Sequence, residues 1–204
     1  TSMKGNLFIV AAASGTGKTS LLSALLQNDS HIRLSISYTT RKPRPGEVDG
    51  VHYHFVDEAE FMRMLGEGEF LESAQVHGAR YGTSQRRVEE VLRAGDDLIL
   101  EIDWQGAQQV RTLLPSAVGI FILPPSIETL AHRLAHRGQD NVEVINRRLA
   151  AAREEISHVA EFDYVIINDD FQTALEDLRA VIHSQHLRRD NQLLKYQALL
   201  NSMK

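Results

Sequence analysis

Four short, mostly apolar runs alternate along the chain with longer segments of helical character. The runs cover residues 7–12, 97–102, 118–123 and 164–167. Apolar runs of this length, bounded by turn signals, are typical of strands buried in a parallel sheet. The pattern therefore predicts an α/β fold with a parallel sheet that helices cover on both faces.

The segments between these runs show the apolar spacing, capping residues and breakers expected of helices. Gly95 and Pro115 each mark the end of a helix. The expected helices cover residues 18–27, 84–94, 105–114, 126–136, 142–159 and 171–189, with a further helical tail towards the C-terminus.

The segment 35–83 has a different pattern, and we expect it to form a small, mostly β lobe inserted into the α/β core. Prolines and glycines in 39–50 prevent regular structure there. Around that loop the expected elements are a strand near 34–38, a strand over 51–56, a helix from Asp57 to about Leu65 with Glu60 completing its cap, and a hairpin of 70–76 with 79–81.

Composition limits the class of protein. The 204 residues suit one α/β domain, and 43% hydrophobic content is enough for a sizeable core. There is no cysteine, and no apolar run approaches membrane-spanning length, so we expect a cytoplasmic protein without a membrane anchor. The net charge of −5 argues against a nucleic-acid partner, although arginines cluster locally as they do in sites for small anions.

The most informative motif is residues 14–19, Ser-Gly-Thr-Gly-Lys-Thr, between the first apolar run and the first helix. Glycines allow several backbone N–H groups to face one anion, and the helix N-terminus adds its dipole. Lys18 can reach the outer phosphates, and the Thr19 hydroxyl can ligate Mg²⁺. The motif predicts a P-loop for a nucleoside triphosphate, although Ala12 stands where the usual pattern has glycine. The alternative is an ordinary strand-to-helix turn.

Two further clusters carry charge suited to phosphate chemistry. Glu101 and Asp103 follow a buried strand, where a carboxylate in P-loop proteins supports Mg²⁺ directly or through water. Arg41 and Arg44 lie in the proline-stiffened loop and can make bidentate hydrogen bonds to one phosphate. The alternatives are a surface acid pair and a solvated basic loop. Tyr53 and Tyr81 flank the lobe and could add hydroxyl donors, although each could equally be a packing residue.

A third cluster places arginines around a glycine-broken segment. Arg133 and Arg137 are one helical turn apart, and Arg147 and Arg148 follow in the next predicted helix. Such a segment suits a mobile lid that brings positive charge to a transferring phosphoryl group. The alternative is a solvated basic helix.

These motifs, in this order, resemble the guanylate kinase family. The landmarks are the P-loop at 14–19, Thr-Thr-Arg-x-x-Arg-x-Gly-Glu at 39–47, Tyr-Gly-Thr at 81–83, acid-Ile-Asp-x-Gln-Gly at 101–106, Pro-Pro-Ser at 124–126, the arginine-rich stretch at 133–148 and Val-Ile-x-Asn-Asp at 165–169. The resemblance covers about residues 6–185. It departs at Ala13, where relatives often carry proline, and at Glu101, which is often aspartate.

The resemblance implies a role for each matching position. Lys18, Arg44, Arg137 and Arg148 would be catalytic. ATP would be bound by Ala12, Ala13, Ser14, Gly15, Thr16, Gly17, Lys18, Thr19, Arg133, Arg137 and Asn168. GMP would be bound by Ser37, Arg41, Arg44, Tyr53, Glu72, Tyr81, Thr83, Glu101, Asp103 and Arg148. Mg²⁺, the cofactor that accompanies ATP as co-substrate, would be held by Thr19 and Asp103.

The resemblance also implies the organisation and the activity. The expected fold is a P-loop NTPase-like parallel sheet flanked by helices. Its core is formed by residues 1–34 and 84–204, with a helical lid at about 126–159 and the GMP-binding lobe at 35–83. The implied reaction transfers the γ-phosphoryl group of ATP to GMP, and by extension to dGMP. A carboxylate at Glu72 suits this reaction, because guanine presents two adjacent donors, N1–H and the N2 amine.

Two alternatives and one open question stay with this interpretation. Some scaffold proteins contain a catalytically inactive guanylate-kinase-like module that binds phosphorylated peptides, but such modules typically have a degraded P-loop. A P-loop kinase for another acceptor, or an NTPase switch, is the second alternative. The tail after Arg189 could pack on the core or form a subunit contact, so a homo-oligomer stays open.

Overall fold

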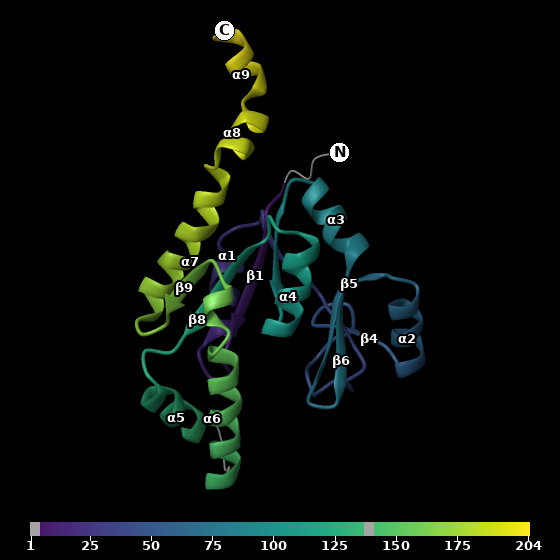
Figure 1. The fold of residues 1–204 in the computed structure, drawn as a ribbon, viewed down its shortest axis with the longest axis vertical. Coiled ribbons are helices and arrows are strands. Elements are labelled where there is room, and N and C mark those ends of the chain that lie inside the picture. The colour runs from purple at the N-terminus through teal and green to yellow at the C-terminus, as the bar shows by residue number, and fades with distance from the viewer. Residues whose placement is uncertain (1–4, 137–140) are drawn as a thin grey trace. The chain divides into compact units, whose positions relative to one another are not determined.

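The computed structural model describes residues 5–136 and 141–204 (Figure 1). The chain divides into two compact units. The first contains the residues up to Ala11 and from Ser30 to Ile120, and the second contains Ala12–Asp29 and Phe121–Lys204. Each unit is described by itself.

A five-stranded sheet has the strand order β2-β7-β1-β8-β9. Its strands are β1 (Leu7–Ala12), β2 (Ile32–Leu34), β7 (Asp97–Glu101), β8 (Val118–Leu123) and β9 (Tyr164–Ile167). β7 pairs in parallel with both β1 and β2. The side chains of Phe8, Ile9, Ile99 and Leu100 are fully buried on these strands, as a sheet covered on both faces requires. The predicted parallel α/β fold is confirmed.

Two helices of the first unit start at capping side chains. In α3 (Gln85–Arg93) the Ser84 hydroxyl accepts from the Arg87 N–H, and in α4 (Trp104–Leu113) the Asp103 carboxylate accepts from the Gly106 N–H. Such caps satisfy N–H groups that have no partner within a helix. α3 packs against β7, and α4 packs against β5 (Phe70–Val76).

A second, four-stranded sheet lies in the first unit with the order β4-β3-β6-β5. It contains β3 (Tyr38–Thr39), β4 (His54–Phe55) and β6 (Ala79–Ser84), together with β5. Helix α2 (Glu58–Gly66) covers it through buried Phe61, whose ring lies 4.6 Å from that of Phe70. The cap of α2 is the predicted one, since Asp57 accepts from the Glu60 N–H.

Two strand predictions around this sheet are wrong in extent. The predicted strand at 34–38 is two separate elements, because β2 ends at Leu34 and β3 begins at Tyr38. Of the predicted strand 51–56, only His54–Phe55 is extended in a sheet. The preceding residues turn instead, and the Val48 N–H donates to Nδ1 of His52 over 2.9 Å.

The second unit contains the first helix and the chain from Phe121 to the C-terminus. Ala13 packs with Leu130, Leu134 and Ala152 in one buried cluster. The elements are α1 (Lys18–Gln27), α5 (Ile127–His136), α6 (Val142–Ile156), the 3₁₀ turn η1 (Val159–Glu161), α7 (Phe171–His186), α8 (Arg189–Lys195) and α9 (Gln197–Ser202). α6 and α7 each end three residues earlier than predicted.

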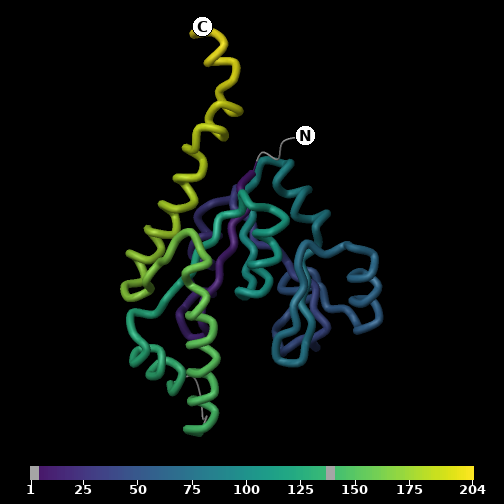
Figure 2. Tube along the Cα trace, viewed as in Figure 1, coloured from purple at the N-terminus to yellow at the C-terminus, as the bar shows by residue number. Residues whose placement is uncertain are grey.

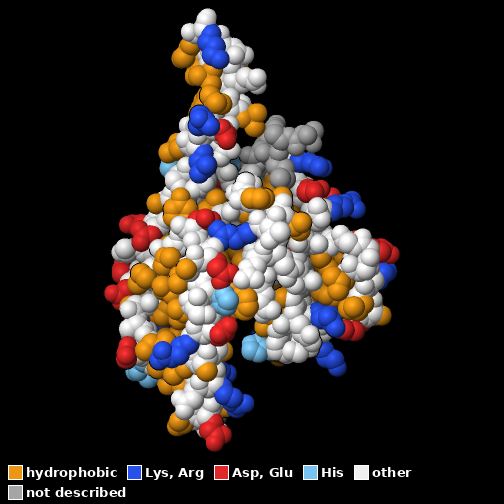
Figure 3. All heavy atoms as spheres, in the orientation of Figure 1, with side chains coloured by type: hydrophobic (Ala, Val, Ile, Leu, Met, Phe, Trp, Pro, Cys, Tyr) orange, Lys and Arg blue, Asp and Glu red, His pale blue; other side chains and the backbone are white. Residues whose placement is uncertain are grey.

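The C-terminal helices follow α7 as consecutive segments (Figure 2). Apolar and basic side chains are interspersed on their surface (Figure 3). Their exposed apolar side chains include Leu193, Leu194, Leu199 and Met203. Of the helices in residues 5–136 and 141–204, none combines the length and the apolar character that crossing a bilayer would demand.

Candidate active site

The loop after β1 has the backbone of an anion-binding turn. Gly15 and Gly17 have φ of +87° and +85°, a conformation that L side chains rarely adopt. Gly17 caps α1, and its carbonyl accepts from the Leu21 N–H at 3.1 Å. The first helical turn then carries Lys18 and the exposed Thr19. A glycine turn that leads into a helix N-terminus can bind phosphate.

Buried contacts fix the shape of this loop. The Thr16 side chain is 1% exposed, and its hydroxyl donates to the Ala13 carbonyl over 2.8 Å. A Cβ on Gly15 would lie 3.0 Å from a methyl carbon of Leu130 and 3.1 Å from one of Leu134. Side-chain packing therefore requires glycine at position 15 in addition to its backbone angle. Ser14 is exposed, and Ala12 is half-buried at the end of β1.

Asn168 connects the segment after β9 to the same loop. Its Nδ2 donates to the Thr16 carbonyl over 2.6 Å, and its backbone N–H donates to the Leu123 carbonyl over 2.8 Å. The Asn168 carbonyl in turn accepts from an Arg133 guanidinium nitrogen at 3.3 Å. A Cβ on Gly17 would lie only 2.6 Å from Nδ2 of Asn168. Asn168, which is 6% exposed, thus holds the loop and contacts one of the predicted ATP-binding arginines.

The arginines of the predicted lid lie on different elements. Arg133 lies on α5, and Arg148 is exposed on α6, a helix that packs against α5. Arg137 lies outside the described residues. The predicted ATP-binding residues that are described, Ala12 to Thr19 with Arg133 and Asn168, all belong to the second unit.

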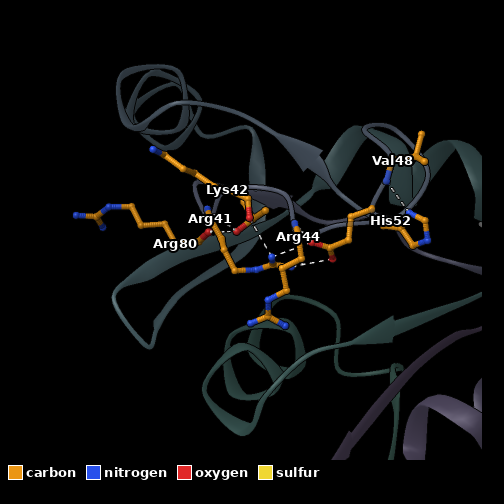
Figure 4. A network of polar contacts seen from close by, with 8 residues as sticks. Arg41, Lys42, Arg44, Val48, His52 and Arg80 are labelled. Carbon is orange, nitrogen blue, oxygen red and sulfur yellow. Dashed lines mark hydrogen bonds and ion pairs between the residues drawn. The ribbon is translucent and has the colours of Figure 1, made fainter.

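In the first unit, the proline-stiffened loop holds Arg41 by a paired interaction with Glu47 (Figure 4). The two terminal nitrogens of Arg41 lie 2.8 and 2.9 Å from the two Glu47 carboxylate oxygens. Oε1 of Glu47 also accepts from the Arg44 N–H over 2.7 Å. These hydrogen bonds lower the pKa of Glu47 to about 2, and the one from Arg41 has the largest effect. The Glu47 carboxylate therefore holds the guanidinium fork of Arg41 within the loop.

The anchoring of this loop extends to β3. The Thr39 hydroxyl is fully buried, donates to the Arg80 carbonyl over 2.9 Å and accepts from the Arg41 N–H over 3.1 Å. Figure 4 shows Arg41 and Arg44 next to each other, with the Lys42 and Arg80 side chains extending away from them. The exposed guanidinium of Arg44 belongs to the same loop.

Tyr53 and Tyr81 lie beside this arginine, as a shared phosphate site requires. The Arg41 guanidinium lies 5.2 Å from the centre of the Tyr53 ring, and the two tyrosine rings meet edge to face at 6.0 Å. Burial raises the pKa of the Tyr53 phenol, so its hydroxyl stays a donor at neutral pH. The structure brings Arg41, Tyr53 and Tyr81 together.

The neighbouring strands carry a buried carboxyl group. Glu72 on β5 is 4% exposed, and Oε1 accepts from the Thr83 hydroxyl of β6 over 2.6 Å. Burial raises the pKa of Glu72 to about 7, with a smaller increase from the charge of Asp103 and an opposing decrease from the Thr83 hydrogen bond. A buried carboxyl with a strongly raised pKa marks a candidate functional site.

The remaining predicted acceptor residues lie in the same unit. The Ser37 carbonyl accepts from the His54 N–H, which fixes Ser37 beside β4. Glu101 is the last residue of β7, whereas Asp103 lies beyond that strand and caps α4. Asp103 therefore belongs to the cap of the helix that follows the strand. Asp103 is held by its cap, with Oδ1 on the Gly106 N–H and Oδ2 on the Gln105 amide.

Sequence reasoning did not single out Glu47, Thr39 and Gly106. Glu47 and Gly106 stand inside recognised motifs, but nothing in the sequence shows that they contact Arg41 and Glu72. A negative residue six positions after an arginine in a turn-rich loop was the available signal for Glu47. Contact between the residue pairs depends on tertiary folding and leaves no periodic pattern.

Comparison with known proteins agrees with this arrangement. A family model described as guanylate kinase matches residues 4–185. The guanylate kinase of Methylobacillus flagellatus is 67% identical over 201 residues, which cover 98% of this chain and 100% of that protein. The guanylate kinase of Dechloromonas aromatica is 57% identical over 201 residues, with the same coverage of 98% and 100%.

A solved structure agrees as well. The crystal structure of guanylate kinase from Anaplasma phagocytophilum aligns with a TM-score of 0.76 at 32% identity, covering 92% of this chain and 89% of that one. The match of the family model and of these relatives extends over nearly the whole sequence. This chain therefore belongs to the guanylate kinase family.

Proposed function

We propose that this protein catalyses ATP + GMP ⇌ ADP + GDP. The observation that carries the proposal is the buried Glu72–Thr83 pair, which shares one small sheet with Tyr81 and borders the loop that holds Arg41. An acceptor-only carboxylate next to a cluster of phosphate-binding donors matches the two ends of GMP. The names of the relatives support the same reaction.

The acceptor site would read each part of GMP with a different group. Arg41, Arg44, Tyr53 and Tyr81 would bind its phosphate, and Ser37, Glu72 and Thr83 would read its base. Ionised Glu72 would accept from N1–H and the N2 amine of guanine. Adenine lacks this pair of donors and would leave the buried carboxylate unpaired, which is a strong basis for rejection. Glu101 and Asp103 would complete this side of the site.

The donor site would hold ATP in the P-loop. Backbone N–H groups of Ser14 to Thr19 would surround the β- and γ-phosphates, with Lys18 on the outer ones. Asn168 holds the loop through the Thr16 carbonyl, and Arg133 donates to the Asn168 carbonyl. Arg133, Arg137 and Arg148 would neutralise the charge that develops on the transferring group.

Transfer itself would need little covalent help from the protein. An oxygen of the GMP phosphate would attack the γ-phosphorus of ATP, forming a new P–O bond while the bond to the β-phosphate oxygen breaks and ADP leaves. Positioning and charge neutralisation supply most of the acceleration in such reactions. Closure of the acceptor lobe and the lid over both nucleotides would exclude water and so prevent ATP hydrolysis.

Mg²⁺ is a metal that suits oxygen ligands such as the Thr19 hydroxyl and the Asp103 carboxylate. The exposed Thr19 hydroxyl, in the first turn of α1, would be a direct ligand. Each carboxylate oxygen of Asp103 accepts one hydrogen bond and keeps a further lone pair, so Asp103 would support the metal directly or through water. When bound there, the metal would supply positive charge that reduces the negative charge of the ATP phosphates.

The wider organisation follows the same proposal. Residues 1–34 and 84–204 would be the core, about 126–159 the lid, and 35–83 the GMP-binding lobe. The protein would act in the cytoplasm on ATP, GMP and dGMP, in purine nucleotide metabolism and GMP recycling. The charge of −5 supports small nucleotides over nucleic acid as partners.

An acceptor panel tests the proposal. ADP release from Mg·ATP is measured with GMP, dGMP, AMP, CMP and UMP in turn. We expect rapid release with GMP and dGMP only. Release with another monophosphate would point to a different kinase, release without acceptor to an NTPase, and no release to a phosphopeptide-binding module.

A further inference from the structure

The buried carboxylate of Glu72 rests against a helix position that has no side chain. A Cβ placed on Gly106 would lie 2.6 Å from Oε2 of Glu72 and 3.2 Å from its Cδ. The first of these distances is below any normal contact between carbon and oxygen. Gly106 is itself buried in the first turn of α4. The space that Oε2 occupies therefore exists because residue 106 is glycine.

The other side of the carboxylate is fixed as well. Oε1 accepts from the Thr83 hydroxyl over 2.6 Å, and only 4% of Glu72 is exposed. Gly106 is held in turn by the Asp103 cap, whose Oδ1 accepts from its N–H at 3.0 Å. The carboxylate thus lies between a hydroxyl donor on β6 and a capped helix turn.

We infer that Gly106 is a positioning residue that sets base specificity by making room for the Glu72 carboxylate. The inference rests on the proposed function, in which Glu72 reads guanine. A methyl group at position 106 would meet the far end of a flexible side chain, so the carboxylate would move and the helix would not. Alanine by itself favours a helix over glycine. The effect should therefore fall on GMP recognition more than on folding.

The test compares Gly106→Ala with Gly66→Ala. Gly66 is the last residue of α2, and a Cβ there would meet nothing within 4 Å. For Gly106→Ala we expect at least a tenfold rise in KM for GMP, a KM for ATP within twofold of the wild type, and weaker preference for GMP over IMP, which lacks the N2 amine. Gly66→Ala should match the wild type in all three. A wild-type KM for GMP in folded Gly106→Ala would overturn the inference.

A double-mutant cycle separates positioning from general damage. With Glu72→Ala the carboxylate is gone, so adding Gly106→Ala should change KM for GMP less than twofold. A further tenfold rise in the double variant would contradict the inference. If Gly106→Ala alone does not fold, recovery of folding in the double variant supports the contact with Glu72, and failure of both to fold contradicts it.

The two proposals fail in different ways. A folded wild-type protein that does not phosphorylate GMP contradicts the proposed function. A wild-type protein that does so, together with a Gly106→Ala variant of unchanged base preference, contradicts only the role of Gly106.

Discussion

The side-chain amide of Asn168 donates a 2.6 Å hydrogen bond to the backbone carbonyl of Thr16, joining the segment after β9 to the middle of the P-loop. The two residues are 152 positions apart, and both are buried. Because the carbonyl of Thr16 points at Asn168, it cannot turn towards a bound phosphate, where an oxygen would repel. The contact therefore favours the orientation of the loop that suits an anion.

Replacing this amide should weaken ATP binding. Asn168→Asp retains the shape but places a carboxylate oxygen against the Thr16 carbonyl. We expect KM for ATP to rise about tenfold, which corresponds to about 1.4 kcal/mol, with KM for GMP within twofold. Steady-state kinetics with each substrate varied in turn measures both.

The matched control for this substitution is Asn28→Asp. The amide of Asn28 also donates to a backbone carbonyl, that of Ala24 at 3.1 Å, but it is exposed. We expect wild-type kinetics in this variant. Equal effects of the two substitutions on KM for ATP would show that the Thr16 contact has no special role.

The raised pKa of Glu72 predicts a pH-dependent stability in the absence of ligands. Its pKa of about 7 in the folded protein exceeds the ordinary glutamate value of 4.5. A carboxyl whose pKa is raised on folding stabilises the folded state. This contribution to the free energy of unfolding is complete below pH 4.5 and disappears as pH rises to about 7. The loss should reach about 3 kcal/mol.

Glu72→Gln, which does not ionise, should remove this dependence. Urea unfolding of both proteins between pH 4.5 and 8 measures it. The stability of the glutamine variant relative to the wild type should increase as pH rises towards 7 and then level off. A constant difference between the two across this range would exclude a raised pKa at Glu72.

Ionisation of Glu72 should also make the KM for GMP depend on pH. An ionised Glu72 accepts from guanine, so binding to the protonated form must release a proton. We expect KM for GMP to fall as pH rises from about 6 to 8, beyond any change in the KM for ATP. Glu72→Gln should flatten the GMP profile, and a wild-type pH profile in that variant would contradict the assignment.

The Arg41–Glu47 pair predicts a further effect on GMP binding. Glu47→Gln retains the size of the side chain but removes the charge that holds the guanidinium fork. We expect KM for GMP to rise severalfold, because both Arg41 and the Arg44 N–H lose a charged acceptor. KM values measured by coupled ADP release at two ionic strengths check this.

Glu60→Gln provides the comparison for Glu47→Gln. Glu60 binds the guanidinium of Arg63 at 2.7 and 2.9 Å on α2, apart from the loop. The substitution Glu60→Gln should leave KM for GMP unchanged. A lower KM for GMP in Glu47→Gln would reverse our interpretation and show that Glu47 competes with the phosphate for Arg41.

The core strands and the glycine turn were predictable from sequence because local physics determines them. Apolar runs identified β1, β8 and β9 with the bounds that the structure has, and the Gly15/Gly17 turn followed from the P-loop pattern. The Asp57 cap was equally local, since acceptor and donor lie three residues apart. Such features need no information about the rest of the chain.

Predictions were weaker where a particular side-chain hydrogen bond or a contact between distant residues decides the conformation. Alternation suggested a strand over 51–56, but a hydrogen bond to His52 stabilises a turn before β4. The roles of Gly106 and Asn168 depend on contacts across 34 and 152 positions, which periodicity does not reveal.

The central claim is phosphoryl transfer from ATP to GMP in a P-loop that uses Lys18. The most direct measurement is chromatographic separation of the products from Mg·ATP and GMP, with wild type, Lys18→Ala and the exposed-lysine control Lys195→Ala. We predict ADP and GDP in equal amounts from the wild type and the control, and a loss of at least about a hundredfold in Lys18→Ala. ADP without GDP, or near-normal turnover in Lys18→Ala, would contradict the account.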